Sequence, residues 1–220
     1  MGVIAGLVPS TNPTSTAMFK TIISVKARNG IVIAPHPTAV KCTAEAVRIL
    51  AEAAVKAGGP AGLIQCLTHV SLPGTSELMK HHYTSLILAT GGSAMVKAAH
   101  SVGKPAFGVG PGNVPCYVDR SADIQQAARY IVASKAFDYS VICATEQAVV
   151  ADLPIASDLK RLMEQEGAYF TNEQQAEQLR RLLFDSAGGM IQKTVGKSAM
   201  VLADLAGFSV PPATRVLVSR

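Results

Sequence analysis

Short apolar runs alternate along the first half of the chain with longer segments whose apolar residues recur at helical spacing. The apolar runs are typical of buried strands and cover residues 3–9, 30–35, 63–70, 85–92 and 105–110. Between them, the spacing predicts helices over residues 14–28, 39–57, 75–82 and 93–103. Such alternation predicts a doubly wound α/β domain with a mainly parallel sheet.

The pattern restarts after the glycine-rich stretch GVGPGN at residues 108–113. Strands are predicted there at residues 115–119 and 146–152, and helices at residues 122–136, 155–166 and 172–184. We therefore place a domain boundary at this stretch. The expected domains are residues 1–110 and residues 111–220.

The composition excludes several classes of protein. A chain of 220 residues with 49% hydrophobic content can bury a genuine core, so disorder is not expected. The net charge of +5 comes from scattered basic residues, and we expect no nucleic-acid partner. No apolar run approaches the roughly 18–20 residues of a membrane-spanning helix, so no membrane association is expected.

Four cysteines, at positions 42, 66, 116 and 143, show neither a CxxC pair nor the Cys/His spacing of a metal site. No metal is therefore expected. Because no apolar leader peptide opens the sequence, we expect free thiols in the reducing cytoplasm. Cys42 and Cys66 are expected to be packing residues, and Cys116 is the rival to Cys143 for reactivity.

Three segments could carry chemistry, and each has a simpler alternative. Thr90, Gly91 and Gly92 join a strand to a helix, which suits a phosphate at the helix N-terminus but equally suits a tightly packed turn. Asn12 follows the first strand and could donate to an oxyanion, or could cap a turn or helix. The apolar neighbours of Cys143 favour a core cysteine over a nucleophile.

Six stretches, taken in order, resemble the aldehyde dehydrogenase superfamily. They are VPSTNPTSTAMFK, APHP, LILATGG, MVKAAHSVGKPAFGVGPGN, ICATEQ and LAGFSVP, which together span essentially the whole chain. The wording is most similar to the CoA-acylating branch, including the aldehyde dehydrogenase half of bifunctional aldehyde/alcohol dehydrogenases. The resemblance implies a Rossmann-like cofactor domain followed by an α/β catalytic domain. Family members are usually much longer, so we expect both domains to be incomplete and the chain to be a central portion.

The resemblance also implies roles for individual residues. Cys143 would attack the aldehyde carbonyl, and Asn12 with the Cys143 backbone N–H would hold the oxyanion. NAD or NADP would accept hydride and leave a thioester on the cysteine. The implied cofactor-binding residues are Thr11, His36, Thr90, Gly91, Gly92 and Gly110. His36 would contact the adenosine, with a solvent-facing turn histidine as the alternative.

Val109 stands where hydrolytic relatives carry the glutamate that activates water. A positioned general base contributes typically ~10²–10⁴ in rate, so water should attack the thioester slowly here. An ionised thiol is a better nucleophile, which makes coenzyme A the expected acceptor. Glu45 and Glu146 are possible substitutes for the base, although a structural or surface role suits both better.

These implications define the expected activity and its alternatives. We expect a small aldehyde and CoA as substrates, a homo-oligomer in the full-length protein, and a cytoplasmic location, with a bacterial microcompartment as a special case. One alternative is a hydrolytic aldehyde dehydrogenase that gives a free acid. The other is a non-catalytic truncated fragment with a binding or assembly role.

Overall fold

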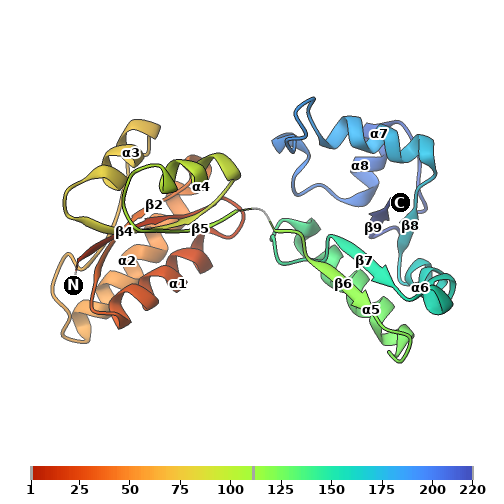
Figure 1. Cartoon of the computed structure of the whole chain (residues 1–220), viewed down its shortest axis with the longest axis horizontal. Coiled ribbons are helices and arrows are strands. Elements are labelled where there is room, and N and C mark those ends of the chain that lie inside the picture. The colour runs from red at the N-terminus through yellow and green to blue at the C-terminus, as the bar shows by residue number, and fades with distance from the viewer. Residues whose placement is uncertain (1, 111, 220) are drawn as a thin grey trace. The chain divides into compact units, whose positions relative to one another are not determined.

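A computed structural model of the chain describes residues 2–110 and 112–219. The chain divides into two compact units, Met1–Pro111 and Gly112–Arg220. Figure 1 labels most of the helices and strands of both units.

The first unit is built on a five-stranded sheet in the order β3-β2-β1-β4-β5, and all of its strand pairs are parallel. The strands are β1 (Val3–Leu7), β2 (Gly30–Ala34), β3 (Ile64–Cys66), β4 (Thr84–Thr90) and β5 (Ala106–Val109). The predicted parallel α/β sheet is confirmed. The third strand is much shorter than residues 63–70, because pairing with β2 ends at Ile33 and Cys66.

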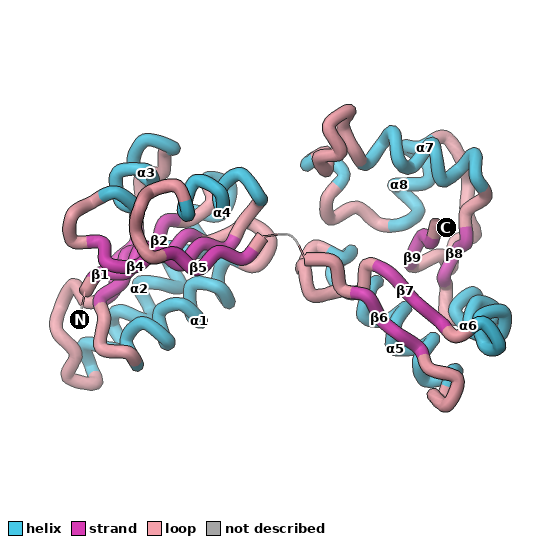
Figure 2. Tube along the Cα trace, viewed as in Figure 1, coloured by secondary structure: helices cyan, strands magenta, loops and turns pink. Residues whose placement is uncertain are grey.

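Helices cover both faces of this sheet, as Figures 1 and 2 show. The helices are α1 (Pro13–Lys26), α2 (Val40–Lys56), α3 (Leu72–Lys80) and α4 (Ser93–His100), with a short 3₁₀ helix η1 (Pro37–Ala39) before α2. Ala17 of α1 and Val47 of α2 pack with Ile31 and Ile33 on one face. Met79 of α3 and Ala99 of α4 pack with Ile87 and other residues on the opposite face. The doubly wound arrangement is therefore confirmed.

The third helix begins earlier than residues 75–82 predicted. The Ser71 side chain caps it by accepting a hydrogen bond of 3.1 Å from the Gly74 N–H. Pro73 lies in the first turn, where its missing N–H costs nothing. The cap and the proline were both visible in the sequence, and together they define the true start.

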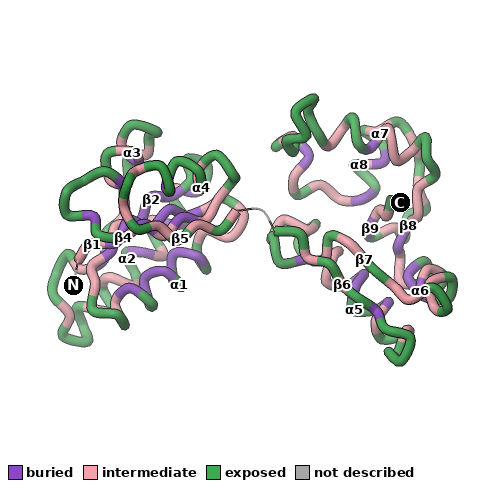
Figure 3. The backbone as a smooth tube through the Cα atoms, viewed as in Figure 1, coloured by how far each residue is buried: buried purple, intermediate pink, exposed green. Residues whose placement is uncertain are grey.

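The second unit contains two separate two-stranded parallel sheets, β6-β7 and β8-β9. Its strands are β6 (Pro115–Val118), β7 (Ala148–Ala151), β8 (Ala168–Phe170) and β9 (Val216–Val218). Its helices are α5 (Ile124–Ala136), α6 (Leu153–Gln165), α7 (Glu173–Leu183) and α8 (Ala199–Ala206), with 3₁₀ helices η2 (Phe137–Ser140) and η3 (Gln192–Thr194). Residues of both sheets and of α5 and α6 form one core, which includes Val118, Val132, Leu159 and Val216. Figure 3 shows the buried positions of both units.

Elements beyond residue 184 were not predicted. The Ser198 side chain accepts from the Val201 N–H at the start of α8, and Gly207 ends this helix in the left-handed conformation with φ of 90°. These are ordinary start and stop signals. The short strands β8 and β9 carry only three residues each, which is too little for a periodic pattern to be seen.

Candidate active site

The first unit has its topological switch point between β1 and β4. These strands are neighbours, with Leu7 paired to Ala89. The chain continues from β1 to β2 on one side of this pair and from β4 to β5 on the other side. Asn12 lies in the segment that follows β1, and Thr90 is the last residue of β4. In open α/β sheets, ligands bind at this edge, outside the carboxyl ends of the strands.

A cavity of about 120 Å³ lies at this edge. Its lining includes His36 from the segment after β2, Thr90 at the end of β4, and Gly91 and Gly92, which follow β4. The structure thus brings together four of the six predicted cofactor-binding residues. Thr11 and Gly110 are not among the residues that line this cavity, so their role stays a prediction.

Gly92 is the N-cap residue of α4 and has no side chain to cap it. A Cβ added here would meet nothing within 4 Å, and its φ of −65° suits any residue. Tight packing therefore does not explain this glycine. The Gly91 N–H is already used, because it donates to the Val109 carbonyl at 3.1 Å. The N-terminus of α4 at Gly92 is covered by no capping side chain, so its positive end is open to an anion.

His36 already has a local role as the N-cap of η1. Its Nδ1 accepts from the Thr38 N–H at 3.3 Å and lies 2.8 Å from the Thr38 hydroxyl oxygen. The residue is exposed and its neighbours Pro35 and Pro37 also line the cavity. The turn alternative is thus present, and the adenosine contact stays a prediction.

Asn12 occupies the N-cap position of α1, yet its side chain forms no capping hydrogen bond. Its amide oxygen accepts instead from the Thr11 hydroxyl at 3.1 Å, and its backbone carbonyl accepts from the Thr16 N–H at 3.1 Å. The alternative of a helix cap is thus present in position, although the capping bond comes from the backbone carbonyl and not from the side chain. With the amide oxygen engaged by Thr11, the NH₂ group is the part of Asn12 suited to donate to a ligand.

Lys20, which sequence reasoning missed, lies buried beneath the same edge. Its Nζ donates to the carbonyl of Leu7 in β1 and, at 2.7 Å, to that of Leu88 in β4. Burial lowers the pKa of this amine to about 7. The sequence does contain a signal for its burial. Lys20 lies at helical spacing from the small residues Ala17 and Ser24, and these three residues share the buried face of α1.

Cys143 lies in the second unit and is exposed, so the expectation of a core cysteine is wrong. Cys143 and Ala144 form the tip of a turn that closes with a 3.4 Å hydrogen bond from the Thr145 N–H to the Ile142 carbonyl. Because the two units are described separately, its approach to Asn12 stays a prediction.

The other cysteines differ in their surroundings. Burial raises the pKa of Cys66 to about 11, and burial followed by the charge of Glu146 raises the pKa of Cys116. Both thiols are thus poor sources of thiolate. Cys42 is exposed on α2, so its expected packing role is wrong, and its sulfur lies 3.3 Å from the Ala39 carbonyl oxygen.

The backbone just before Cys143 is strained. Asp138, Tyr139 and Ser140 have φ angles of 48°, 50° and 60°, in the left-handed region that favours glycine. Each such residue costs roughly 1–2 kcal/mol. Strain of this kind persists only where the surroundings hold it, and it is concentrated at functional sites.

Val109 ends β5, where it is the register partner of Thr90, and its side chain is 60% exposed. The correspondence of this position to the hydrolytic glutamate stays a prediction. Glu45 forms a 2.6 Å ion pair with Arg48 on the exposed surface of α2, as a surface role requires. Glu146 is half-buried, and one of its carboxylate oxygens has no hydrogen-bond partner among the described residues.

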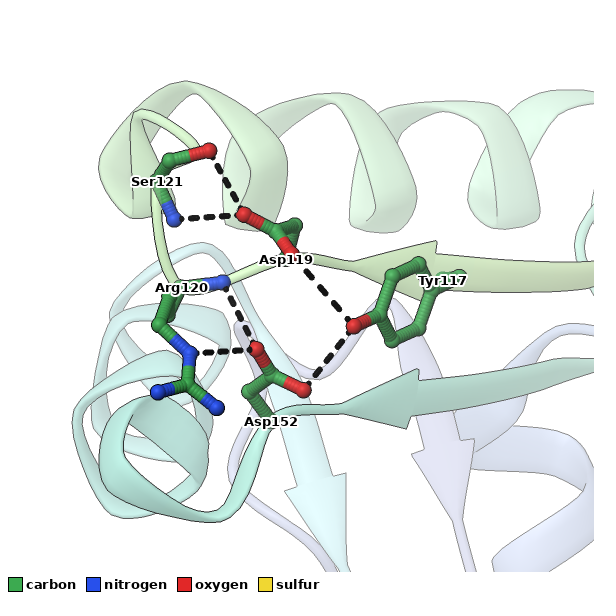
Figure 4. A network of polar contacts seen from close by, with 5 residues as sticks. All are labelled: Tyr117, Asp119, Arg120, Ser121 and Asp152. Carbon is green, nitrogen blue, oxygen red and sulfur yellow. Dashed lines mark hydrogen bonds and ion pairs between the residues drawn. The ribbon is translucent and has the colours of Figure 1, made fainter.

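A polar network joins the ends of β6 and β7 (Figure 4). The Tyr117 hydroxyl donates to Asp152 at 2.9 Å, and the backbone N–H and Nε of Arg120 donate to the other oxygen of that carboxylate at 3.1 and 3.0 Å. Asp119 accepts from the backbone N–H and hydroxyl of Ser121. These bonds tie the turn after β6 to the residue that follows β7, which is a structural role.

Within residues 2–110 and 112–219, no group of three or more His, Cys, Asp or Glu residues is placed to hold a metal ion. None of the described helices is both long and apolar enough to cross a membrane.

The fold, the glycine edge and the exposed cysteine together define a class: the chain belongs to the aldehyde dehydrogenase family, whose family model matches residues 1–182. Over its whole length, the chain is 47% identical to an aldehyde-alcohol dehydrogenase from Streptococcus pneumoniae, and it covers 26% of that protein.

Solved structures agree. An acetylating aldehyde dehydrogenase from Geobacillus thermoglucosidasius matches with a TM-score of 0.92 and 51% identity, over 99% of this chain and 48% of that one. Propionaldehyde dehydrogenase from Rhodopseudomonas palustris, solved with bound CoA and an acylated cysteine, matches with a TM-score of 0.89 and 35% identity, over 99% of this chain and 50% of that one. The chain thus spans about half the length of these solved relatives. The resemblance to the CoA-acylating branch is confirmed.

Proposed function

We propose that this chain carries the cofactor edge and the nucleophile of an NAD(P)-dependent, CoA-acylating aldehyde dehydrogenase. The reaction converts a small aldehyde and CoA to an acyl-CoA, reversibly, through a thioester on Cys143. The observation that carries the proposal is the exposure of Cys143 at the tip of a turn, in a family where a relative holds an acylated cysteine.

The first step forms a bond between the Cys143 sulfur and the aldehyde carbon. The carbonyl oxygen takes up the negative charge, and the amide of Asn12 and the backbone N–H of Cys143 donate hydrogen bonds to it. Donors aimed at a developing oxyanion are often the largest single contribution to such catalysis. A nicotinamide bound at the β1–β4 edge would accept the hydride when the C–H bond of that carbon breaks, and the carbonyl would then re-form as a thioester on Cys143.

The second step releases the acyl group to a thiol. Val109 has no carboxylate that could activate water. Hydrolysis of the thioester therefore lacks the roughly 3–5 kcal/mol by which a general base lowers the barrier. The CoA thiolate attacks the thioester carbon and the Cys143 thiolate leaves, so the cysteine is regenerated. In the reverse direction, acyl-CoA acylates Cys143 and CoA departs as the thiolate.

The residues at the edge suit one phosphate of a dinucleotide. Gly92 leaves the N-terminus of α4 open for a phosphate, and Thr90 and His36 border the same cavity. A solved relative, an engineered glycolyl-CoA reductase 35% identical to this chain with a TM-score of 0.88, holds NADP⁺. We propose NAD or NADP as the cofactor, with Thr11 and Gly110 as further contacts.

The full-length protein is proposed to form a homo-oligomer in the cytoplasm, with a bacterial microcompartment as a special case. Support for the microcompartment comes from a propionaldehyde dehydrogenase of the Clostridium phytofermentans fucose utilisation microcompartment, 36% identical with a TM-score of 0.90.

The half-reaction with acyl-CoA tests the proposal without the nicotinamide. The chain is incubated with acetyl-CoA, and acylated peptides are located by mass spectrometry, with Cys143→Ala as the matched control. We expect acetylation at Cys143 that is absent from the control, and removal of the acetyl group by free CoA at least ~10²-fold faster than by buffer. Equal acetylation of all four cysteines would favour a non-catalytic fragment. Rapid loss of the acetyl group in buffer alone would favour a hydrolytic enzyme.

A further inference from the structure

The turn that carries Cys143 is closed by one buried hydroxyl group. Thr145 is 3% exposed, and its Oγ1 lies 2.8 Å from the Ser140 hydroxyl oxygen, 3.3 Å from the Ile142 carbonyl oxygen and 3.4 Å from Nε2 of Gln147. A hydroxyl offers one donor and two acceptor positions. Thr145 can therefore donate to Ile142 while it accepts from Ser140 and Gln147, which uses its full capacity.

These contacts reach both ends of the cysteine segment. Ser140 is the last of the three strained residues and precedes Cys143 by three positions, whereas Thr145 follows it by two. The Ser140–Thr145 hydrogen bond therefore closes a loop around the nucleophile. Because Thr145 is buried, water competes poorly for these bonds.

Gln147 anchors this loop to the body of the second unit. Its Nε2 also donates to the Thr145 carbonyl at 3.2 Å, and its Oε1 accepts from Nζ of Lys135 on α5 at 2.8 Å. Its backbone N–H donates to the Val114 carbonyl, just before β6, at 3.0 Å. The hydroxyl of Thr145 is thus linked to both a helix and a strand.

We propose that Thr145 is a positioning residue whose hydroxyl, by joining Ser140 to Ile142, holds the strained turn and so fixes the direction in which Cys143 presents its thiol for acyl transfer. This inference rests on the proposed function. Without the hydroxyl, residues 138–140 are released toward ordinary backbone angles, and the turn tip moves with them. Acyl transfer is sensitive to such displacement, because a misplacement of about 1 Å can cost ~10²-fold in rate.

The test compares two reactions of the same thiol in the 220-residue chain. Acetylation of Cys143 by acetyl-CoA requires an oriented attack, whereas alkylation by iodoacetamide requires only an accessible thiol. Thr145→Val removes the hydroxyl at nearly constant volume, and Thr145→Ser retains it. Ser140→Ala removes a single bond and serves as the milder variant if Thr145→Val fails to fold, which far-UV circular dichroism reports.

We expect Thr145→Val to slow acetylation by ~10–100-fold and alkylation by less than about twofold. Thr145→Ser should restore acetylation to within about threefold of the wild type, and Ser140→Ala should lie between the two. Amide hydrogen exchange of residues 138–147 should accelerate in Thr145→Val and, by less, in Ser140→Ala, but not in Thr145→Ser. Wild-type rates of acetylation and exchange in folded Thr145→Val or Ser140→Ala would overturn the inference.

The same experiment separates failure of the inference from failure of the proposed function. If the wild-type chain is not acetylated at Cys143, the proposed function fails, while the exchange rates of residues 138–147 still report on Thr145. If the wild type is acetylated and the variants match it, only the positioning role of Thr145 is lost.

Discussion

Replacement of Lys20 by Met should make the stability of the first unit depend less on pH. The buried amine has a pKa of about 7 against an ordinary value of 10.5, and burial is the cause. Between these two values the unfolded chain binds one more proton than the folded chain, so wild-type stability rises with pH. Below about pH 7 the amine is charged in both states, and the cost of burying the charge is felt in full.

The size of the effect follows from the two pKa values. One pKa unit corresponds to about 1.4 kcal/mol, and partial titration near pH 7 reduces the gain at the lower end of the range. Between pH 7 and pH 9, the wild type should therefore gain about 2 kcal/mol relative to Lys20→Met. The variant should also be less stable at pH 9, since the carbonyls of Leu7 and Leu88 each lose a donor, at about 1–3 kcal/mol for a group left unsatisfied.

Urea unfolding followed by circular dichroism at both pH values measures this difference. Other titrating groups are common to the wild type and the variant, so they cancel when the two are subtracted. Lys26→Met, at the exposed end of the same helix, is the matched control and should show the wild-type pH dependence. Identical pH dependence in Lys20→Met and the wild type would refute the idea that this amine titrates near neutral pH.

Three further changes test other parts of the structure. Gly167→Ala should destabilise the second unit by about 1–3 kcal/mol in urea unfolding, because φ is 99° and the new Cβ would lie 2.9 Å from a carbonyl oxygen. Gly112→Ala is the control and should leave the stability unchanged, because its Cβ would meet nothing within 4 Å. The Tyr117 hydroxyl and then Arg120 lower the pKa of Asp152, so the contribution of this carboxylate to stability is present above its ordinary pKa of 3.8 and is lost as pH falls further. In acid unfolding, the stability difference between the wild type and Asp152→Asn should therefore shrink. A constant difference would contradict this. Val109→Glu should shorten the lifetime of acetylated Cys143 in buffer by up to ~10²–10⁴-fold, as measured by mass spectrometry, and an unchanged lifetime would count against its assigned position.

The sheet of the first unit could be predicted because its signals are local. Each strand is an apolar run and each helix has apolar residues at helical spacing, so period and length were enough to find them. The order of the strands is a different matter, since β1 pairs with β4 across the intervening 76 residues between Leu7 and Thr84. The last strands, β8 and β9, have too few residues for a period, and their pairing depends on a core shared with α5 and α6.

The candidate site divides in the same way. Thr90, Gly91 and Gly92 were found because a strand that runs into glycines and then a helix is a local pattern. The apolar neighbours of Cys143 led to the wrong expectation of a core cysteine. Apolar neighbours in the sequence occur both in core segments and in turns that are held by other contacts. The contacts that hold the turn come from Thr145, two residues away, whose hydroxyl contacts Ser140 and Ile142 before the cysteine and Gln147 after it.

Lys20 shows why such residues escape a reading of the sequence. A lysine in a helix normally suggests a solvated face, and the bonds that retain this one come from backbone carbonyls, which have no residue identity. The two carbonyls belong to β1 and β4, the strands whose divergence creates the ligand edge. A buried amine thus donates to both of the strands that lead to Asn12 and Thr90. The geometry of the edge therefore depends on the interior of the domain as well as on the loops above it.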